Sequence, residues 1–317
     1  MLMGKSNHIL TVCAALLLIL LLPLIGYPEK GECLRKTVMV GSSSRGYMVY
    51  RPASAASGKP LPLVIVLHGM NGSGLVMSMF SGFNELAEKN NFIVMYPDAF
   101  GPLWNDGRVD MDSISFRTGV DDVQFIIQLV DSMVAISEVD PKRVYAAGFS
   151  NGGMMALRLG IAASDRIAAV ASVAGLMPKH LSLVRPSRPV PFLMIHGTED
   201  KTVPWGGGVL MRGKKKRGEV LSVLDTVSYW VRNDGCTSQV SVKILPDRET
   251  RDGTVSFLVT YGCPDPDNEV LLVSIQGGGH TWPGAEKYLP ELNAGKISRD
   301  FNASQFIWEF FSRHKLP

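Results

Sequence analysis

Short apolar runs alternate with longer amphipathic segments along most of the chain. Eight runs have the length and apolar content of buried strands: residues 37–40, 46–51, 62–67, 92–96, 143–147, 167–172, 190–195 and 270–275. Five longer segments have helical periodicity: residues 75–89, 121–136, 151–163, 219–233 and 303–313. Strands that alternate with helices form a largely parallel sheet with helices on both faces. The pattern therefore predicts an α/β fold with a mostly parallel central sheet.

Two features set the expected boundaries of this fold. Residues 240–245 and 255–261 have the pattern of an added strand pair, and residues 33–317 show no linker, internal repeat or second domain. Only fifteen residues, Gly175–Pro189, connect the sixth and seventh predicted strands. Because this connection is too short for a large cap domain, we expect one domain with an open cleft or groove.

The first 26 residues differ from the rest of the chain. Lys5 precedes a long, mostly apolar run from Ile9 to Leu22. A charged start followed by an apolar run is typical of a secretion signal. The run is long, and the sequence before Gly26 is a poor cleavage site, so a membrane anchor over residues 9–26 is the alternative. Both interpretations predict a secreted or otherwise extracytoplasmic protein.

The composition is that of an ordinary globular protein, with 46% hydrophobic and 19% charged residues. The net charge of +3 falls to +2 without residues 1–26, which hold one lysine and no acid. This balance predicts no general attraction to nucleic acid. The local basic run Arg212–Arg217 is interpreted as a solvated loop, with docking of an anionic polymer or cell surface as the alternative.

Residues Gly148–Gly152 carry the strongest chemical signal. The sequence Gly-Phe-Ser-Asn-Gly follows the predicted strand 143–147 and opens the predicted helix 151–163. A serine between glycines at a strand-to-helix turn is the nucleophile elbow of α/β-hydrolases. The tight turn needs small residues at its flanks, and the helix start directs free N–H groups at the site. The pattern predicts that Ser150 is a nucleophile.

A serine nucleophile needs a base, and chain order selects His280 among the six histidines. His8 lies in the apolar leader and His314 near the C-terminus, while His68 and His196 end strands in His-Gly pairs. His180 precedes any plausible acid, which breaks the order Ser, Asp, His of this fold. His280 follows the strand 270–275 in a loop with three glycines, which can bring an imidazole over the serine.

The orienting acid and the oxyanion donors follow from the same topology. The strand 190–195 leads to Glu199 and Asp200, of which Asp200 is preferred because the chain then turns away; Glu199 is the reserve. One oxyanion donor is expected from the N–H of Asn151, directly after the nucleophile. The other should come from the loop after strand 62–67, with Met70 preferred and Asn71 in reserve.

These motifs together resemble those of a known enzyme family. They are His68-Gly69, Gly148–Met154, His196–Asp200 and the Gly-Gly-Gly-His-Thr-Trp-Pro-Gly element at Gly277–Gly284. The set resembles the extracellular polyhydroxybutyrate depolymerase and feruloyl esterase family, which includes acetylxylan esterases. The similarity covers roughly residues 33–317. It implies an α/β-hydrolase fold and ester hydrolysis by Ser150, Asp200 and His280, without a cofactor.

Three tryptophans and two cysteines complete the candidate residues. Trp104, Trp205 and Trp282 lie on loops near the predicted triad and are expected to stack on substrate. Cys236 and Cys263 bracket the added strand pair and are expected to form a disulfide in an oxidising compartment, which leaves Cys33 unpaired and Cys13 in the leader. No metal-ligand spacing is present, so no metal site is predicted.

The favoured function is a secreted serine ester hydrolase that forms an acyl-enzyme. Its expected substrate is a polymeric or oligomeric ester, either a polyester or an esterified polysaccharide. One alternative is a peptidase of the prolyl-oligopeptidase kind, which shares the hydrolase sheet but usually carries a propeller domain that is absent from this sequence. The other is a non-catalytic surface-binding protein on a hydrolase scaffold, which would be expected to lack a triad residue.

Overall fold

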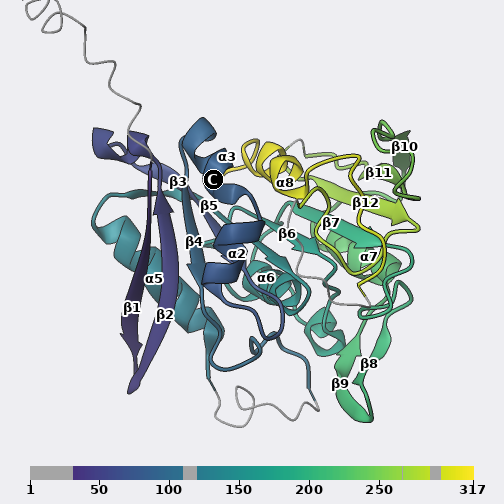
Figure 1. Cartoon of the computed structure of the whole chain (residues 1–317), viewed down its shortest axis with the longest axis horizontal. Coiled ribbons are helices and arrows are strands. Elements are labelled where there is room, and N and C mark those ends of the chain that lie inside the picture. Colours follow the sequence, from purple (N-terminus) through teal and green to yellow (C-terminus); the bar gives the residue numbers. More distant parts are fainter. Residues whose placement is uncertain (1–30, 110–119, 266, 286–293) are drawn as a thin grey trace, which may run out of the picture. The chain divides into compact units, whose positions relative to one another are not determined.

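The computed structural model describes residues 31–109, 120–265, 267–285 and 294–317 (Figure 1). Gly31–Pro317 forms one compact unit. The predicted signal or anchor at residues 1–26 lies outside the described residues. Within the described ranges, no helix is both long and apolar enough to cross a bilayer.

A ten-stranded sheet organises this unit, in the order β1-β2-β4-β3-β5-β6-β7-β12-β11-β10. The strands are β1 (Glu32–Val40), β2 (Ser43–Arg51), β3 (Leu61–Leu67), β4 (Ile93–Pro97), β5 (Val139–Phe149), β6 (Ala169–Val173), β7 (Phe192–Gly197), β10 (Val240–Ile244), β11 (Val255–Tyr261) and β12 (Val270–Gln276). The six central strands, from β4 to β12, pair in parallel. Two antiparallel strands extend the sheet at each edge. The predicted mostly parallel sheet is confirmed.

Helices cover both faces of the sheet, as predicted (Figure 1). They are α2 (Gly74–Phe80), α3 (Phe83–Asn90), α5 (Asp122–Ala135), α6 (Asn151–Ala162), α7 (Val223–Asn233) and α8 (Ala303–Phe311). Successive residues of a strand point to opposite faces. Leu63 and Ile65 of β3 accordingly pack in one core with α5, α6 and α7. Val64 and Val66 pack in a second core with α2, α3 and α8. Burial on both faces explains why β3 is apolar throughout.

Local capping explains where the helices depart from the sequence prediction. The predicted helix 75–89 forms two helices, α2 and α3. Gly82 lies between them with a φ of 73°, a left-handed conformation that interrupts a right-handed helix. The predicted helix 219–233 begins only at Val223, where the Ser222 side chain accepts a hydrogen bond from the N–H of Asp225. Between β6 and β7 the chain forms one short 3₁₀ helix, η3 (Lys179–Leu183), so there is no large cap.

The basic run is part of a hairpin rather than a loop. β8 (Gly208–Arg212) pairs antiparallel with β9 (Lys215–Val220) in a separate two-stranded sheet. Gly213, with a φ of 60°, provides the turn at its tip. The interpretation of Arg212–Arg217 as a loop was therefore wrong. Glycine and lysine are uncommon in strands, and this composition concealed the pairing.

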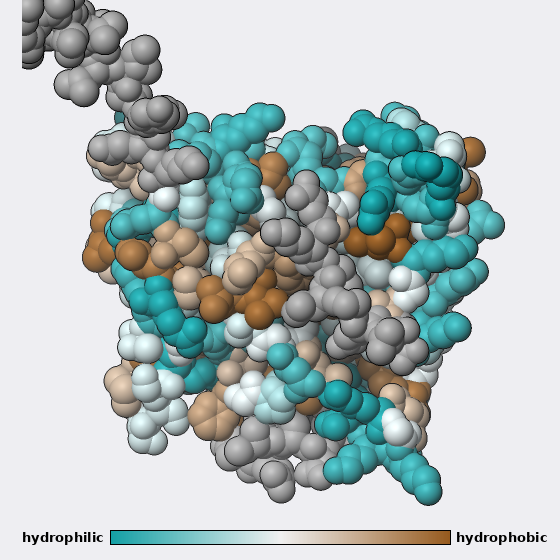
Figure 2. Space-filling model, viewed as in Figure 1, coloured by the Kyte–Doolittle hydropathy of each residue, from teal (hydrophilic) through white to brown (hydrophobic). Residues whose placement is uncertain are grey.

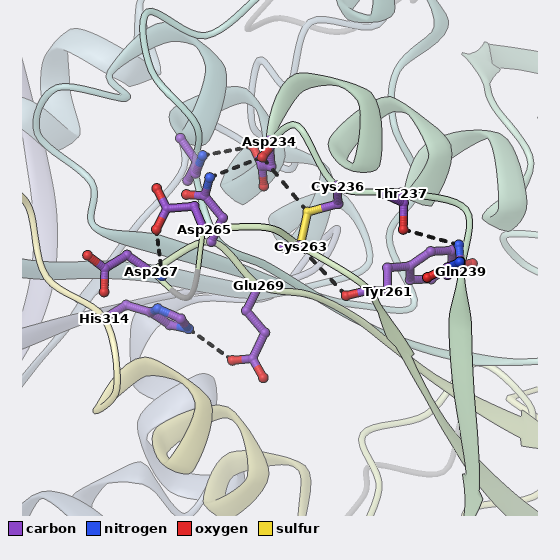
Figure 3. The surroundings of a disulfide bond; sticks show 12 residues. Asp234, Cys236, Thr237, Gln239, Tyr261, Cys263, Asp265, Asp267, Glu269 and His314 are labelled. Carbon is purple, nitrogen blue, oxygen red and sulfur yellow. Dashed lines mark hydrogen bonds and ion pairs between the residues drawn. A yellow bond between two sulfur atoms is a disulfide. The ribbon is translucent and has the colours of Figure 1, made fainter.

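A disulfide closes the added strand pair, as predicted. Cys236 lies before β10 and Cys263 lies after β11, and the two sulfur atoms are bonded (Figure 3). Next to the bridge, the carboxylate of Asp234 accepts a hydrogen bond from the N–H of Val190 at 2.9 Å, just before β7. The bridge therefore joins the segment after α7 (Val223–Asn233) to the end of β11, which lies next to β12 in the sheet. Cys33 is a free, exposed cysteine.

Candidate active site

Ser150 occupies a strained turn between β5 and α6. Its φ of 55° and ψ of −118° are unusual for a residue with a side chain, and such strain is common at functional sites. A Cβ atom on Gly148 would lie 2.3 Å from the carbonyl group of Gly152. A Cβ atom on Gly152 would lie 2.2 Å from the carbonyl oxygen of Leu67. The backbones approach so closely that both flanking positions require glycine, as the sequence predicted.

Asp200 is held rigidly by three donors directly after β7. One carboxylate oxygen accepts hydrogen bonds from the N–H groups of Thr202 and Val203, each at 2.8 Å. The other oxygen lies 2.7 Å from Nδ1 of His280, and the Asp200 side chain is fully buried. Glu199, the reserve candidate, is exposed to solvent. The structure therefore pairs Asp200, not Glu199, with the histidine.

His280 is positioned by a glycine loop that follows β12. The N–H of His280 donates to Ala294, and the N–H of Gly279 donates to Lys296 at 2.9 Å. A Cβ atom on Gly279 would lie 2.1 Å from the Ala294 carbonyl oxygen, so this close approach requires glycine. The N–H of Glu199 donates to Gly278 at 2.9 Å, which joins the acid loop to the base loop.

The three candidate residues lie at the same end of the sheet, where its parallel strands have their carboxyl ends. Ser150, Asp200 and His280 follow the carboxyl ends of β5, β7 and β12, which are central parallel strands. Open α/β sheets bind ligands at the carboxyl ends of their strands. The ring of Phe149, the residue before the serine, packs 4.8 Å from the ring of His280, centroid to centroid. The imidazole therefore lies beside the elbow while its Nδ1 faces Asp200.

The loop after β3 lies against the elbow. A Cβ atom on Gly69 would be 3.5 Å from the Cβ atom of Ser150. The N–H of Asn71 donates to the Pro102 carbonyl at 2.8 Å, so it is already engaged. The Met70 N–H has no backbone acceptor among the described residues. This geometry favours Met70 over Asn71 as the donor beside Asn151; the oxyanion role of both remains a prediction.

Comparison with known proteins decides the family. The sequence profile of the phospholipase/carboxylesterase family matches residues 52–217, slightly more than half of the chain. The chain belongs to this family. It is 34% identical over 289 residues (87% of this chain, 81% of the relative) to NocK of Nocardia uniformis subsp. tsuyamanensis, a protein that carries the name of an esterase. It is 31% identical over 243 residues (74% of this chain) to feruloyl esterase B of Piromyces equi.

The solved structures show the same fold in this carboxylesterase family member. An acetyl xylan esterase from Aspergillus awamori superposes with a TM-score of 0.59 at 16% identity, covering 88% of this chain and 99% of that chain. Together, the profile and the relatives identify the protein as a serine esterase with an α/β-hydrolase fold. The chain spans only 42% of feruloyl esterase B, so the whole activity of that relative is not transferred here.

A buried network of hydrogen bonds, which the sequence analysis did not predict, supports the elbow of this esterase. The Asn151 amide accepts the N–H of Trp104 at 2.8 Å and donates to the carboxylate of Asp106. Asp106 in turn binds the guanidinium of Arg108, with the closest atoms 2.7 Å apart. Arg108 then donates to the carbonyl of Arg217 in β9 at 2.7 Å. Because Asp106 and Arg108 are almost fully buried, this hydrogen-bond network links the elbow rigidly to the β8–β9 hairpin.

Two further histidines support the site without taking part in the triad. His68 donates from Nδ1 to the Gly69 carbonyl at 2.7 Å and accepts the N–H of Ala99 at Nε2. His196 donates from Nε2 to the Val203 carbonyl at 2.9 Å. Burial lowers the pKa of both imidazoles, so both are neutral near pH 7. The His68 ring therefore fixes the loop after β3, and the His196 ring fixes the loop after β7, as their His-Gly context suggested.

The expected substrate contacts of the tryptophans need correction. The Trp104 and Trp282 side chains have no solvent-exposed surface, so the prediction that they stack on substrate is wrong. The Trp104 indole donates to the His68 carbonyl at 2.9 Å, and the Trp282 indole donates to the Ser304 hydroxyl at 3.0 Å. Both rings pack behind the loops of the site. Trp205 is half-buried, and its contact with substrate remains a prediction.

Proposed function

We propose that this protein is an exported serine esterase that hydrolyses carboxylic esters through an acyl-enzyme, with Ser150 as nucleophile, His280 as base and Asp200 as orienting acid. The observation that carries this proposal is the buried contact of 2.7 Å between Asp200 and His280 beside the strained serine. Nucleophilic catalysis by serine requires this arrangement of nucleophile, base and orienting group.

In the proposed reaction, the Ser150 hydroxyl oxygen attacks the ester carbonyl while the neutral imidazole of His280 accepts its proton. Asp200 stabilises the resulting imidazolium through Nδ1. The N–H groups of Asn151 and Met70 bind the oxyanion of the tetrahedral intermediate. Collapse expels the alcohol, which takes the proton from His280. Water then repeats the sequence on the acyl-enzyme and releases the carboxylic acid and the free serine.

The substrate is proposed to be an oligomeric or polymeric ester. The relatives' names include feruloyl esterase, a bifunctional acetylxylan esterase/xylanase and poly(3-hydroxybutyrate) depolymerase. The short connection between β6 and β7 supports an open site, which suits an ester on a large molecule. Export is supported by the Cys236–Cys263 disulfide, because disulfides persist in oxidising compartments.

The decisive variant is Ser150→Ala. Its turnover of methyl ferulate, acetylated xylan or a hydroxybutyrate oligomer should fall on the order of a millionfold, with the thermal midpoint near that of wild type. Ser57→Ala, at an exposed serine in the 3₁₀ helix Ala53–Ser57, is the matched control and should retain full activity. A fluorophosphonate should label wild type and Ser57→Ala but not Ser150→Ala.

Two outcomes would contradict the proposal. Substantial ester hydrolysis by Ser150→Ala would exclude this serine as the nucleophile. Cleavage of dipeptide amides by wild type, without cleavage of any ester, would instead favour the peptidase alternative.

A further inference from the structure

A groove is lined by residues of the β8–β9 hairpin and of η3. The groove has a volume of about 490 Å³. One wall is apolar and includes Val109, Leu183 and Val209, whose side chains are also exposed. Lys179, His180 and Lys216 supply basic groups to the lining. An apolar wall edged by cations suits a ligand with both an apolar body and negative charge.

The hairpin carries unpaired lysines both in the groove lining and next to it. Lys214, Lys215 and Lys216 are exposed at or near its tip, and none has an acidic partner within the part of the chain that the structure describes. Glu219, the one acid among the described lining residues, is paired with Lys179 at 2.8 Å, so the two charges offset each other. Figure 2 shows the lower right of the molecule, where this hairpin projects, as a hydrophilic protrusion. The described tip of the hairpin therefore carries excess positive charge, although the net charge of the whole chain is only +3.

Two contacts place this positive surface within reach of the elbow. A guanidinium nitrogen of Arg212 in β8 lies 3.2 Å from the sulfur of Met70, in the loop expected to supply an oxyanion donor. On the other side, a Cβ atom on Gly175 would lie 2.5 Å from the Ser150 carbonyl oxygen. Lys179 in the groove lining follows four residues later, so the groove begins at most about 14 Å from Gly175. A polymeric substrate is therefore long enough to span the distance from Ser150 to the groove.

We propose that the β8–β9 hairpin and the adjoining groove form a subsite for a substrate chain that carries carboxylates. This inference rests on the proposed ester hydrolysis and narrows its substrate class. A neutral polyester would gain nothing from these cations, whereas an esterified polysaccharide with acidic sugars would be attracted and oriented by them. The hairpin therefore favours an acidic, esterified polysaccharide over the neutral polymers.

The test compares two polymers that differ only in charge. Acetylated xylan with glucuronic acid branches is the acidic probe, and the same xylan after reduction of its carboxyl groups is the neutral probe. Wild type should show a KM roughly fivefold lower for the acidic polymer, a preference that 0.5 M salt removes by screening. Lys215→Gln/Lys216→Gln should lose this preference, because its KM for the acidic polymer should rise toward its KM for the neutral polymer.

Lys243→Gln is the matched control, since Lys243 is an exposed lysine of β10 at the far edge of the central sheet. It should keep the preference for the acidic polymer. Binding of both polymers to the inactive Ser150→Ala variant gives a second readout that needs no turnover. Equal binding of the two polymers, or equal weakening of both by Lys215→Gln/Lys216→Gln, would overturn the subsite. Failure of the proposed esterase function would give a different result from failure of the subsite, because wild type would then hydrolyse neither the acidic nor the neutral ester.

Discussion

Breaking the buried Asp106–Arg108 pair should reduce both stability and turnover. Asp106→Ala would leave the Arg108 guanidinium, which is 4% exposed, without its carboxylate. Removing one partner of a buried ion pair typically costs about 3–5 kcal/mol. Since domains of this kind are stable by about 5–15 kcal/mol, the variant should lose roughly a fifth or more of its free energy of unfolding.

The activity should fall through Asn151. Asp106 accepts a hydrogen bond from the Asn151 side chain, and the Asn151 N–H is the expected oxyanion donor. A displaced donor weakens binding of the transition state more than binding of the substrate. We expect kcat of Asp106→Ala on methyl ferulate to fall by about tenfold to a hundredfold, with little change in KM. Turnover is measured well below the thermal midpoint, so that only folded enzyme contributes.

Urea denaturation followed by tryptophan fluorescence measures the change in stability. Asp140→Ala is the matched control, because Asp140 binds Arg143 at the same 2.7 Å but on the surface, where such pairs contribute about 1 kcal/mol or less. The double variant Asp106→Leu/Arg108→Met removes both charges and should lose less stability than Asp106→Ala alone. If Asp106→Ala costs no more than Asp140→Ala, the argument from burial is refuted.

Three further predictions concern the elbow, the disulfide and a buried acid. Gly152→Ala should abolish activity, because the added methyl would lie 2.2 Å from a backbone oxygen, whereas Gly206→Ala, with open space around its Cβ position, should stay active. The double variant Cys236→Ser/Cys263→Ser should lose about 3–4 kcal/mol of unfolding free energy, measured by urea denaturation against reduced and oxidised wild type. Burial raises the pKa of Asp234 to about 7, above an unfolded value of about 3.9, so the folded state loses stability as pH rises between these values. Asp234→Asn should therefore raise the thermal midpoint relative to wild type more at pH 8 than at pH 5, and an equal shift at both would contradict this.

Much of the fold and the candidate triad could be predicted, because both depend on the order of strands and helices along the sequence. Parallel strands place their carboxyl ends at one edge, so a serine, an acid and a histidine after β5, β7 and β12 had to gather there. The choice of Asp200 over Glu199 also agreed with the observed pairing, although it rested only on the expected turn of the chain.

The directions of loop side chains could not be predicted in the same way. Trp104 and Trp282 lie on loops beside the site, but their indole groups donate to His68 and Ser304, which are 36 and 22 residues away in sequence. Asp106 and Arg108 are only two residues apart, yet their importance depends on burial that brings Arg217 to them from β9. Contacts of this kind depend on packing between distant segments, and a pattern along one chain does not encode them locally.

The construction of the β8–β9 hairpin bears on how enzymes of this family can diversify. Its base is fixed, because Arg217 accepts a hydrogen bond from Arg108, and Val220 forms a bridge with Pro178. Its tip has free space around it: a Cβ atom on Gly213 would meet nothing within 4 Å, although the φ of 60° still favours glycine at that position. Insertions or deletions at the tip would change how far the hairpin reaches without moving the base that supports the elbow. Loop-exchange experiments should therefore graft new tips between Arg212 and Lys215 and leave the residues from Arg217 onward intact.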